Sequence, residues 1–170
     1  MYMRPVLLNS CAMAATAEEA RYRINAPIVA SKAVRVVALD AGAAPIVQRV
    51  AKHPWTSARF YICAPVARTD GAGSAIDVDL ATIDGSATRL SDELIDVDAT
   101  VMVATGNAGA TPASAIGMAC TLRGIMTAGL ILGTGHEADA AAAALRPYAR
   151  VLLISKDEHD VFDVLTALRA

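Results

Sequence analysis

Aromatic residues are scarce in this chain, and so are charged residues. Phe, Trp and Tyr make up only 4% of its 170 residues, so the core must be built from Ala, Val, Ile and Leu. Charged residues amount to 19% and hydrophobic residues to 55%, which excludes disorder for most of the length. The formal net charge of -2 provides no field that would attract a nucleic acid or an anionic membrane. We therefore expect neither of these as a partner.

Cysteine is also rare, and the three cysteines, Cys11, Cys63 and Cys120, are far apart and form no CxxC pair. This pattern is typical of a reducing compartment, so we expect a cytoplasmic protein. No hydrophobic run reaches the roughly 18 residues that a membrane-spanning helix requires. The three histidines show no metal-ligand spacing with cysteines or carboxylates, so no metal site is expected.

The length predicts one main domain. Residues 1–32 are interpreted as an N-terminal arm with a short helix, and residues 33–170 as a single Rossmann-like domain. Strand-like apolar runs alternate there with helical patterns, which predicts an α/β fold of three layers: a mostly parallel sheet with helices on both faces. Ser155 and Glu158 have the spacing of a capping box for the last helix. The expected strands cover 34–39, 59–63, 76–83, 100–104, 125–132 and 150–154, and the expected helices begin near residues 45, 91, 112, 137 and 156.

The most informative segment is the turn Thr105-Gly-Asn-Ala-Gly-Ala-Thr111, which lies between a strand and a helix that begins at Pro112. Small residues let the backbone approach a ligand, and a helix N-terminus offers free N–H groups to an anion. Thr111 is suited to cap the helix. Two interpretations stay open: an anion site, or a tight and well-capped turn. The phosphate contacts of the first interpretation are Thr105, Gly106, Asn107, Gly109 and Thr111.

A second turn, Asp40-Ala-Gly-Ala-Ala44, follows the first expected strand. A carboxylate at a strand end can hold a ribose hydroxyl or a cation, and Gly42 permits a turn with positive φ. In that case Asp40, Gly42 and Ala43 line the wall opposite the first turn. The favoured alternative is an aspartate that caps the following helix.

A third turn, Gly133-Thr-Gly-His-Glu-Ala138, matches the G-x-G-x-x-G/A pattern of dinucleotide-binding domains. Gly133 and Gly135 would lie against a pyrophosphate, and Asp157 would hold the ribose of NAD(P). The competing interpretation is a surface turn without a ligand.

Four segments together resemble the nucleotide-binding half of the bacterial tubulin-like cell-division GTPases, the FtsZ/tubulin family. Residues 98–106 are similar to the strand that enters the family's phosphate loop, and residues 124–131 to the strand after it. Residues 151–157 are similar to the strand before the central helix, and 39–47 take the place of the first glycine-rich turn. The resemblance implies a guanine nucleotide at the Thr105–Thr111 turn.

The chain also departs from the family pattern. Gly109 and Thr111 match the glycine-rich phosphate loop, but alanines and a proline replace other glycines. The family's second domain, which carries a catalytic acidic loop, is not part of this sequence. We therefore do not expect this chain alone to hydrolyse GTP, and no catalytic residue is assigned.

Three functional hypotheses follow. The first is a small domain that binds a nucleotide or another phosphorylated small molecule at the strand-end turns. The second is a non-enzymatic protein that kept a tubulin-like fold and assembles with itself or with a protein partner. The third is an NAD(P)-dependent reductase-like domain built on the third turn.

Overall fold

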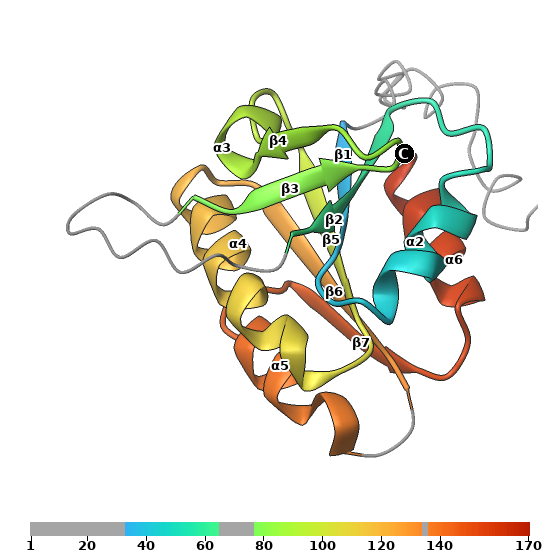
Figure 1. The fold of residues 1–170 in the computed structure, drawn as a ribbon, viewed down its shortest axis with the longest axis vertical. Coiled ribbons are helices and arrows are strands. Elements are labelled where there is room, and N and C mark those ends of the chain that lie inside the picture. Colours follow the sequence, from blue (N-terminus) through green and yellow to red (C-terminus); the bar gives the residue numbers. More distant parts are fainter. Residues whose placement is uncertain (1–32, 65–76, 134–135) are drawn as a thin grey trace, which may run out of the picture. The chain divides into compact units, whose positions relative to one another are not determined.

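The computed structural model describes residues 33–64, 77–133 and 136–170, which all belong to one compact unit, Ser31–Ala170. Its centre is a seven-stranded sheet with the strand order β4-β3-β2-β1-β5-β6-β7 (Figure 1). The expected N-terminal arm and its short helix lie outside the described residues. The strands are β1 Val34–Ala38, β2 Ala58–Cys63, β3 Asp79–Thr82, β4 Ala87–Arg89, β5 Ala99–Ala104, β6 Met126–Leu132 and β7 Val151–Ser155, and the helices are α2 Ala43–Val50, α3 Leu90–Glu93, α4 Ala110–Leu122, α5 Asp139–Leu145 and α6 His159–Leu168.

Five of the strands are parallel, namely β2, β1, β5, β6 and β7, whereas β3 and β4 add an antiparallel edge. The expected α/β fold with a mostly parallel sheet is confirmed. The expected edge strand over 76–83 is present as the shorter β3. Strand β4 was not predicted, because its three residues are too few to show an alternation of polar and apolar side chains.

Helices cover both faces of the sheet, with α2 and α6 on one side and α4 and α5 on the other (Figure 1). Every residue of β1 and β5 is buried, as expected for central strands of a doubly covered parallel sheet. Alternate side chains of β1 enter different cores: Val36 packs with Val47 and Leu165, and Val37 packs with the α4 and α5 side. The part of the chain that the structure describes contains no helix long and apolar enough to cross a membrane.

The start of α6 differs from the sequence prediction. The helix begins at His159, and the carboxylate of Asp157 accepts a hydrogen bond from the His159 amide at 2.8 Å. The Ser155 hydroxyl accepts from the Asp157 amide, and Glu158 forms an ion pair with Arg49 of α2 at 2.5 Å. The predicted capping box of Ser155 and Glu158 is therefore wrong, because the helix starts one turn later than that pairing requires.

Candidate functional site

Three turns meet at the carboxyl edge of the parallel strands. In chain order the parallel strands are arranged 2-1-3-4-5, so the strand order reverses between β1 and β5. Ligands of open α/β sheets bind outside the carboxyl ends of the strands at such a reversal. The turns after β1 and β5, which the sequence singled out separately, lie next to each other at this place.

Asp40 joins these two turns through its carboxylate. One oxygen, Oδ2, accepts from the amides of Thr105 at 2.8 Å and Gly106 at 3.0 Å. The other, Oδ1, accepts from the Thr105 hydroxyl at 2.7 Å and from the Ala43 amide at 2.9 Å. We call this arrangement the Asp40 clasp. Since a carboxylate offers about four acceptor positions, these four donors satisfy it.

The clasp explains the ionisation of Asp40 and limits what its partners can bind. Burial of the carboxyl group raises its pKa, but the hydrogen bonds from Thr105, Ala43 and Gly106 outweigh burial, so the pKa is lowered below 3.8. Asp40 thus stays ionised and takes the place that an external anion would occupy at Thr105 and Gly106. The bond to Ala43 also stabilises the start of α2, which is the capping role that the sequence favoured.

Glycines in these turns serve close packing. A Cβ atom on Gly42 would lie 2.1 Å from the Thr105 hydroxyl oxygen, and one on Gly109 would lie 3.0 Å from the Cβ of Leu39. By contrast, a Cβ on Gly106 would have no neighbour nearer than 4.0 Å. Gly42 and Gly109 are therefore required by the approach of the two turns to each other, independently of any ligand. Gly42 has a φ of −74°, so the expected turn with positive φ is wrong: Thr105 leaves no room for a side chain there.

The turn after β5 continues directly into α4. A short 3₁₀ turn, Asn107–Gly109, precedes the helix, whose first residue is Ala110. No side chain caps this helix, so the predicted capping role of Thr111 is wrong; Thr111 lies inside the first turn. Asn107, Ala108 and Thr111 are exposed, whereas Thr105 and Gly106, which bind Asp40, are partly buried.

The segment after β6 packs against the turn after β5. The Asn107 side-chain oxygen accepts from the Ala140 amide of α5 at 2.8 Å, and a Cβ on Gly133 would lie 3.8 Å from the Thr105 carbonyl oxygen. His136 pairs with Asp139 at 2.6 Å on the surface. Gly135 lies outside the described residues. The dinucleotide hypothesis assigns the Asp157 carboxylate to a ribose. One oxygen of this carboxylate already accepts a hydrogen bond from the His159 amide at the start of α6.

Cys63 ends β2 beside Asp40. Burial raises the pKa of its thiol to about 12, and the negative charge of Asp40 adds to this shift. A thiol with such a pKa stays protonated at neutral pH and is a poor nucleophile. Within the described residues no group of three or more His, Cys, Asp or Glu side chains could hold a metal ion.

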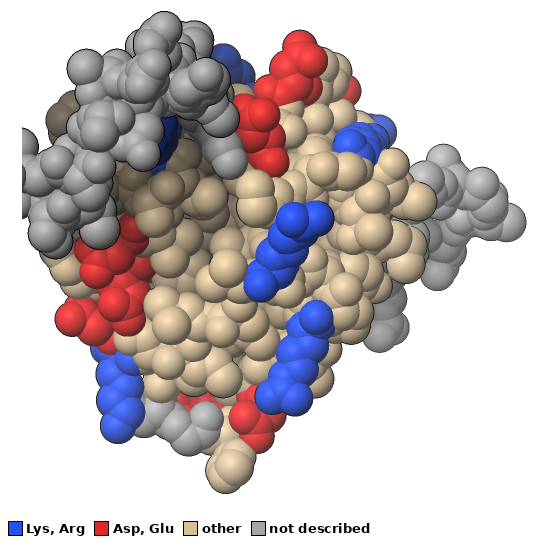
Figure 2. Space-filling model, turned by 180° about the vertical axis from the view of Figure 1, so that it is seen from behind, with Lys and Arg blue, Asp and Glu red and all other residues tan. Residues whose placement is uncertain are grey.

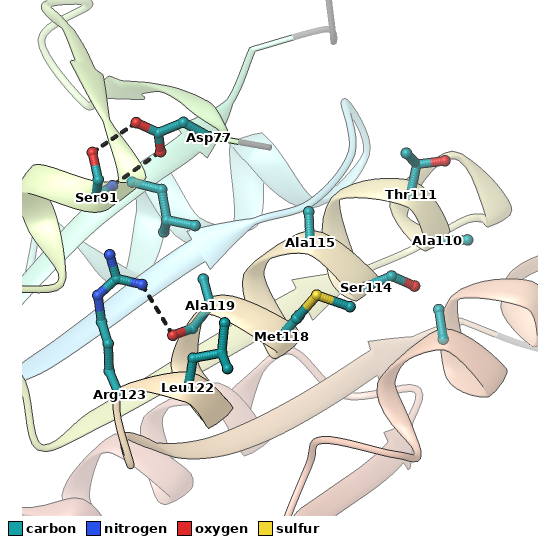
Figure 3. A pocket seen from close by; sticks show the side chains of 12 residues that line it. Asp77, Ser91, Ala110, Thr111, Ser114, Ala115, Met118, Ala119, Leu122 and Arg123 are labelled. Atoms are coloured by element: carbon teal, nitrogen blue, oxygen red, sulfur yellow. Dashed lines mark hydrogen bonds between the residues drawn. The ribbon is translucent and has the colours of Figure 1, made fainter. Parts of the chain in front are cut away.

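A groove with a volume of about 680 Å³ runs along the outer face of α4 (Figure 3). Its size is within the range of small-molecule sites. Ala110 and Thr111 lie at one end, Leu122 and Arg123 at the other, and Asp77 and Ser91 face the helix from across the groove. The remaining lining residues are mostly apolar: Leu90, Ser114, Ala115, Met118, Ala119 and Ala144.

This groove was not expected from the sequence, although the residues of α4 carry a signal for it. A surface helix of a globular protein normally has one apolar face. In α4 the inner face holds Ile116 and Cys120, yet the outer face holds Met118 and Leu122, which are 55% and 81% exposed. A helix that is apolar on both faces predicts a second contact surface.

On the groove's far wall, Asp77 is held by Ser91. Its oxygens accept from the Ser91 hydroxyl at 2.6 Å and from the amides of Ser91 and Val78 at 3.1 and 3.0 Å. Desolvation raises its pKa, but these bonds and the charge of Arg89 outweigh desolvation, so the pKa is lowered. Asp77 is therefore an ionised carboxylate whose oxygens are bound by Ser91 and Val78, and it is a poor candidate for a general acid.

The structure is thus a Rossmann-like α/β domain with a groove of small-molecule size next to its strand-end turns. Comparison of the chain with protein-family models, with curated proteins and with solved structures found no match. The expected relation to the FtsZ/tubulin family consequently stays a prediction.

Proposed function

We propose that this chain is a binding domain for a phosphorylated small molecule, such as a nucleotide, and that the ligand lies in the groove along α4. The observation that carries the proposal is the position of the groove, because it opens at the first turn of α4, where the turns after β1, β5 and β6 converge. The phosphate would lie near Asn107, Ala108 and Thr111, and the rest of the molecule would extend along the helix.

This assignment changes the role of several residues in the sequence-based hypothesis. The amides of Thr105 and Gly106 are engaged by Asp40, so Asp40 positions the turns and does not contact the ligand. The phosphate would bind the exposed residues of the turn after β5. The positive partial charge at the start of α4 would be the main source of attraction for it. The proposal is for binding, because Asp77, the one carboxylate among the described residues that line the groove, is held by Ser91 and Val78.

The test is a calorimetric titration with AMP, GMP, ATP, GTP and inorganic phosphate, together with thermal unfolding. Thr111→Glu should remove phosphate binding, because it puts a carboxylate where the phosphate would lie. The variant should stay folded, since an acidic side chain in a first helical turn is favourable by about 0.3–1 kcal/mol. Thr166→Glu, on the exposed side of α6, is the matched control. Absence of heat with every ligand, or equal binding by Thr111→Glu and the wild type, would contradict the proposal.

A second candidate function, self-association, is favoured by the exposed edge of the sheet. Among the described residues no strand pairs with the outer side of β7, and Val151 and Ile154 on this strand are 56% and 61% exposed. The molecule seen from behind also presents a broad surface with few charged side chains (Figure 2). Light scattering tests this candidate: a dimer that Ile154→Lys dissociates would support it, and a monomer at every concentration would exclude it.

A further inference from the structure

The groove along α4 is apolar along most of its length and charged at one end, and this division indicates which class of ligand the groove can bind. Along its length the helix contributes Ala115, Met118, Ala119 and Leu122, and Leu90 lies among the other lining residues. Such a surface is stabilised when aliphatic or aromatic carbon covers it and removes it from water. A sugar or another strongly hydrated group would instead lose hydrogen bonds to water there.

The far end of the groove carries a positive charge. Arg123 follows the last turn of α4, and its Nη1 donates to the Ala119 carbonyl oxygen at 3.2 Å. A guanidinium has five N–H donors, so most of its donors are left for another partner. No carboxylate forms an ion pair with Arg123 within the described ranges, and the nearby Asp77 is engaged by Ser91.

From these two features we infer that the ligand is an amphipathic acid, with an aliphatic or aromatic body along α4 and a carboxylate bound by Arg123. Arg123 is twelve positions after Thr111, which corresponds to about 18 Å along a helix with a rise of about 1.5 Å per residue. A nucleoside is thus a poorer fit to the groove than an extended carbon chain. The inference rests on the proposed function in one respect, namely that the groove is the ligand site.

Dodecanoate is a suitable probe because it has the apolar body and the carboxylate but no phosphate. Calorimetry on the full-length chain should show saturable binding of one dodecanoate per chain, below its micellar concentration. Arg123→Gln should weaken dodecanoate about fivefold to tenfold, the range for one charge-assisted contact that is partly exposed. The same variant should leave the binding of dodecanol unchanged, since dodecanol lacks the carboxylate.

Met118→Glu should abolish dodecanoate binding, because it puts a negative charge in the middle of the groove. Two control variants are matched in chemistry and exposure but lie outside the groove: Arg146→Gln after α5 and Ile95→Glu after α3. Both should bind dodecanoate as the wild type does. Circular dichroism and thermal unfolding of each variant confirm that a loss of binding does not come from a loss of fold.

The possible outcomes separate this inference from the proposed function. Dodecanoate binding that depends on Arg123 and Met118 supports the inference, even where the phosphate titrations show no heat. Nucleotide binding without dodecanoate binding overturns the inference and leaves the proposed function standing. Non-saturable dodecanoate binding, or equal effects of the groove and control variants, overturns it as well. The chain could also form an oligomer that Met118→Glu dissociates and that does not respond to dodecanoate. That result would assign the groove to contact between copies of the chain and would overturn the inference.

Discussion

Removal of the Asp40 clasp should destabilise the domain without changing its fold. The carboxylate links the start of α2 to the end of β5, and it is the acceptor for three backbone amides and one hydroxyl. Asp40→Ala leaves these donors without their partner. Asp40→Asn keeps one acceptor oxygen but places an amide NH₂ group next to backbone donors.

The magnitude follows from the number and exposure of these bonds. A hydrogen bond to a charged group contributes about 1.5–3 kcal/mol, and a buried donor left unsatisfied costs about 1–3 kcal/mol. Because the clasp is only part-buried, water will satisfy some of the freed donors. We expect Asp40→Ala to lose about 2–4 kcal/mol of unfolding free energy and Asp40→Asn somewhat less. For a domain of this size that corresponds to a fall in Tm of roughly 5–15 °C.

The assay is urea unfolding at several pH values, with Asp163→Asn on the exposed side of α6 as the control. The pKa of Asp40 is lowered in the folded state, so its stabilisation is complete above the unfolded pKa of about 3.9 and disappears as pH falls through the folded value. The difference between the wild type and Asp40→Asn should therefore be constant from pH 5 to 7 and shrink below about pH 4. The m-value should stay unchanged.

Chemical rescue sharpens this test. In Asp40→Ala the amides of Thr105 and Gly106 form an empty anion cradle, so acetate should raise the Tm of this variant more than that of the wild type. The reasoning would be refuted by a loss below about 0.5 kcal/mol for Asp40→Ala. A pH-independent loss that persists below pH 3 would also refute it, because the effect would then not come from the ionised carboxylate.

Three further predictions follow from close contacts and burial. Gly117→Ala should cost about 1–3 kcal/mol in urea unfolding, because its Cβ would lie 2.4 Å from the Tyr148 ring, and Tyr148→Ala should relieve most of this cost. Gly124→Ala should lower the free energy of unfolding by about 1 kcal/mol, because Gly124 has a φ of +70°, which strains an alanine. The space around Gly124 is open, so strain of the backbone is the main effect, and Gly124→Asn should cost less. In a variant whose other cysteines are serine, Cys63 should react with a thiol reagent at pH 8 far more slowly than after unfolding in urea, because its folded pKa is about 12; equal rates would contradict the burial argument.

Much of the architecture follows from local sequence patterns. The buried runs that became β1, β5 and β6 are long and apolar, and each is followed by small residues and a helix, which is enough to predict a parallel sheet. Segments without a clear period of hydrophobic residues were not predicted, or were predicted at the wrong position. Strand β4 is too short to alternate visibly, and the start of α6 depends on whether Ser155 or Asp157 supplies the hydrogen bond.

The turns that could carry function were also visible in the sequence, since small residues and an aspartate follow strands where ligands of such folds bind. What the sequence could not reveal is that these turns bind each other. Asp40 and Thr105 are 65 residues apart, and they meet because β1 and β5 pair in register.

Hydrophobic period and turn residues act locally, and they are therefore enough to predict the class of fold and the strand ends at which ligands of such folds bind. How this protein uses those strand ends emerges only in the folded molecule. There the Asp40 carboxylate accepts from the amides of Thr105 and Gly106, and the outer face of α4 is left as a groove. Both outcomes depend on which distant elements become neighbours, and that is set by the packing of helices on the sheet.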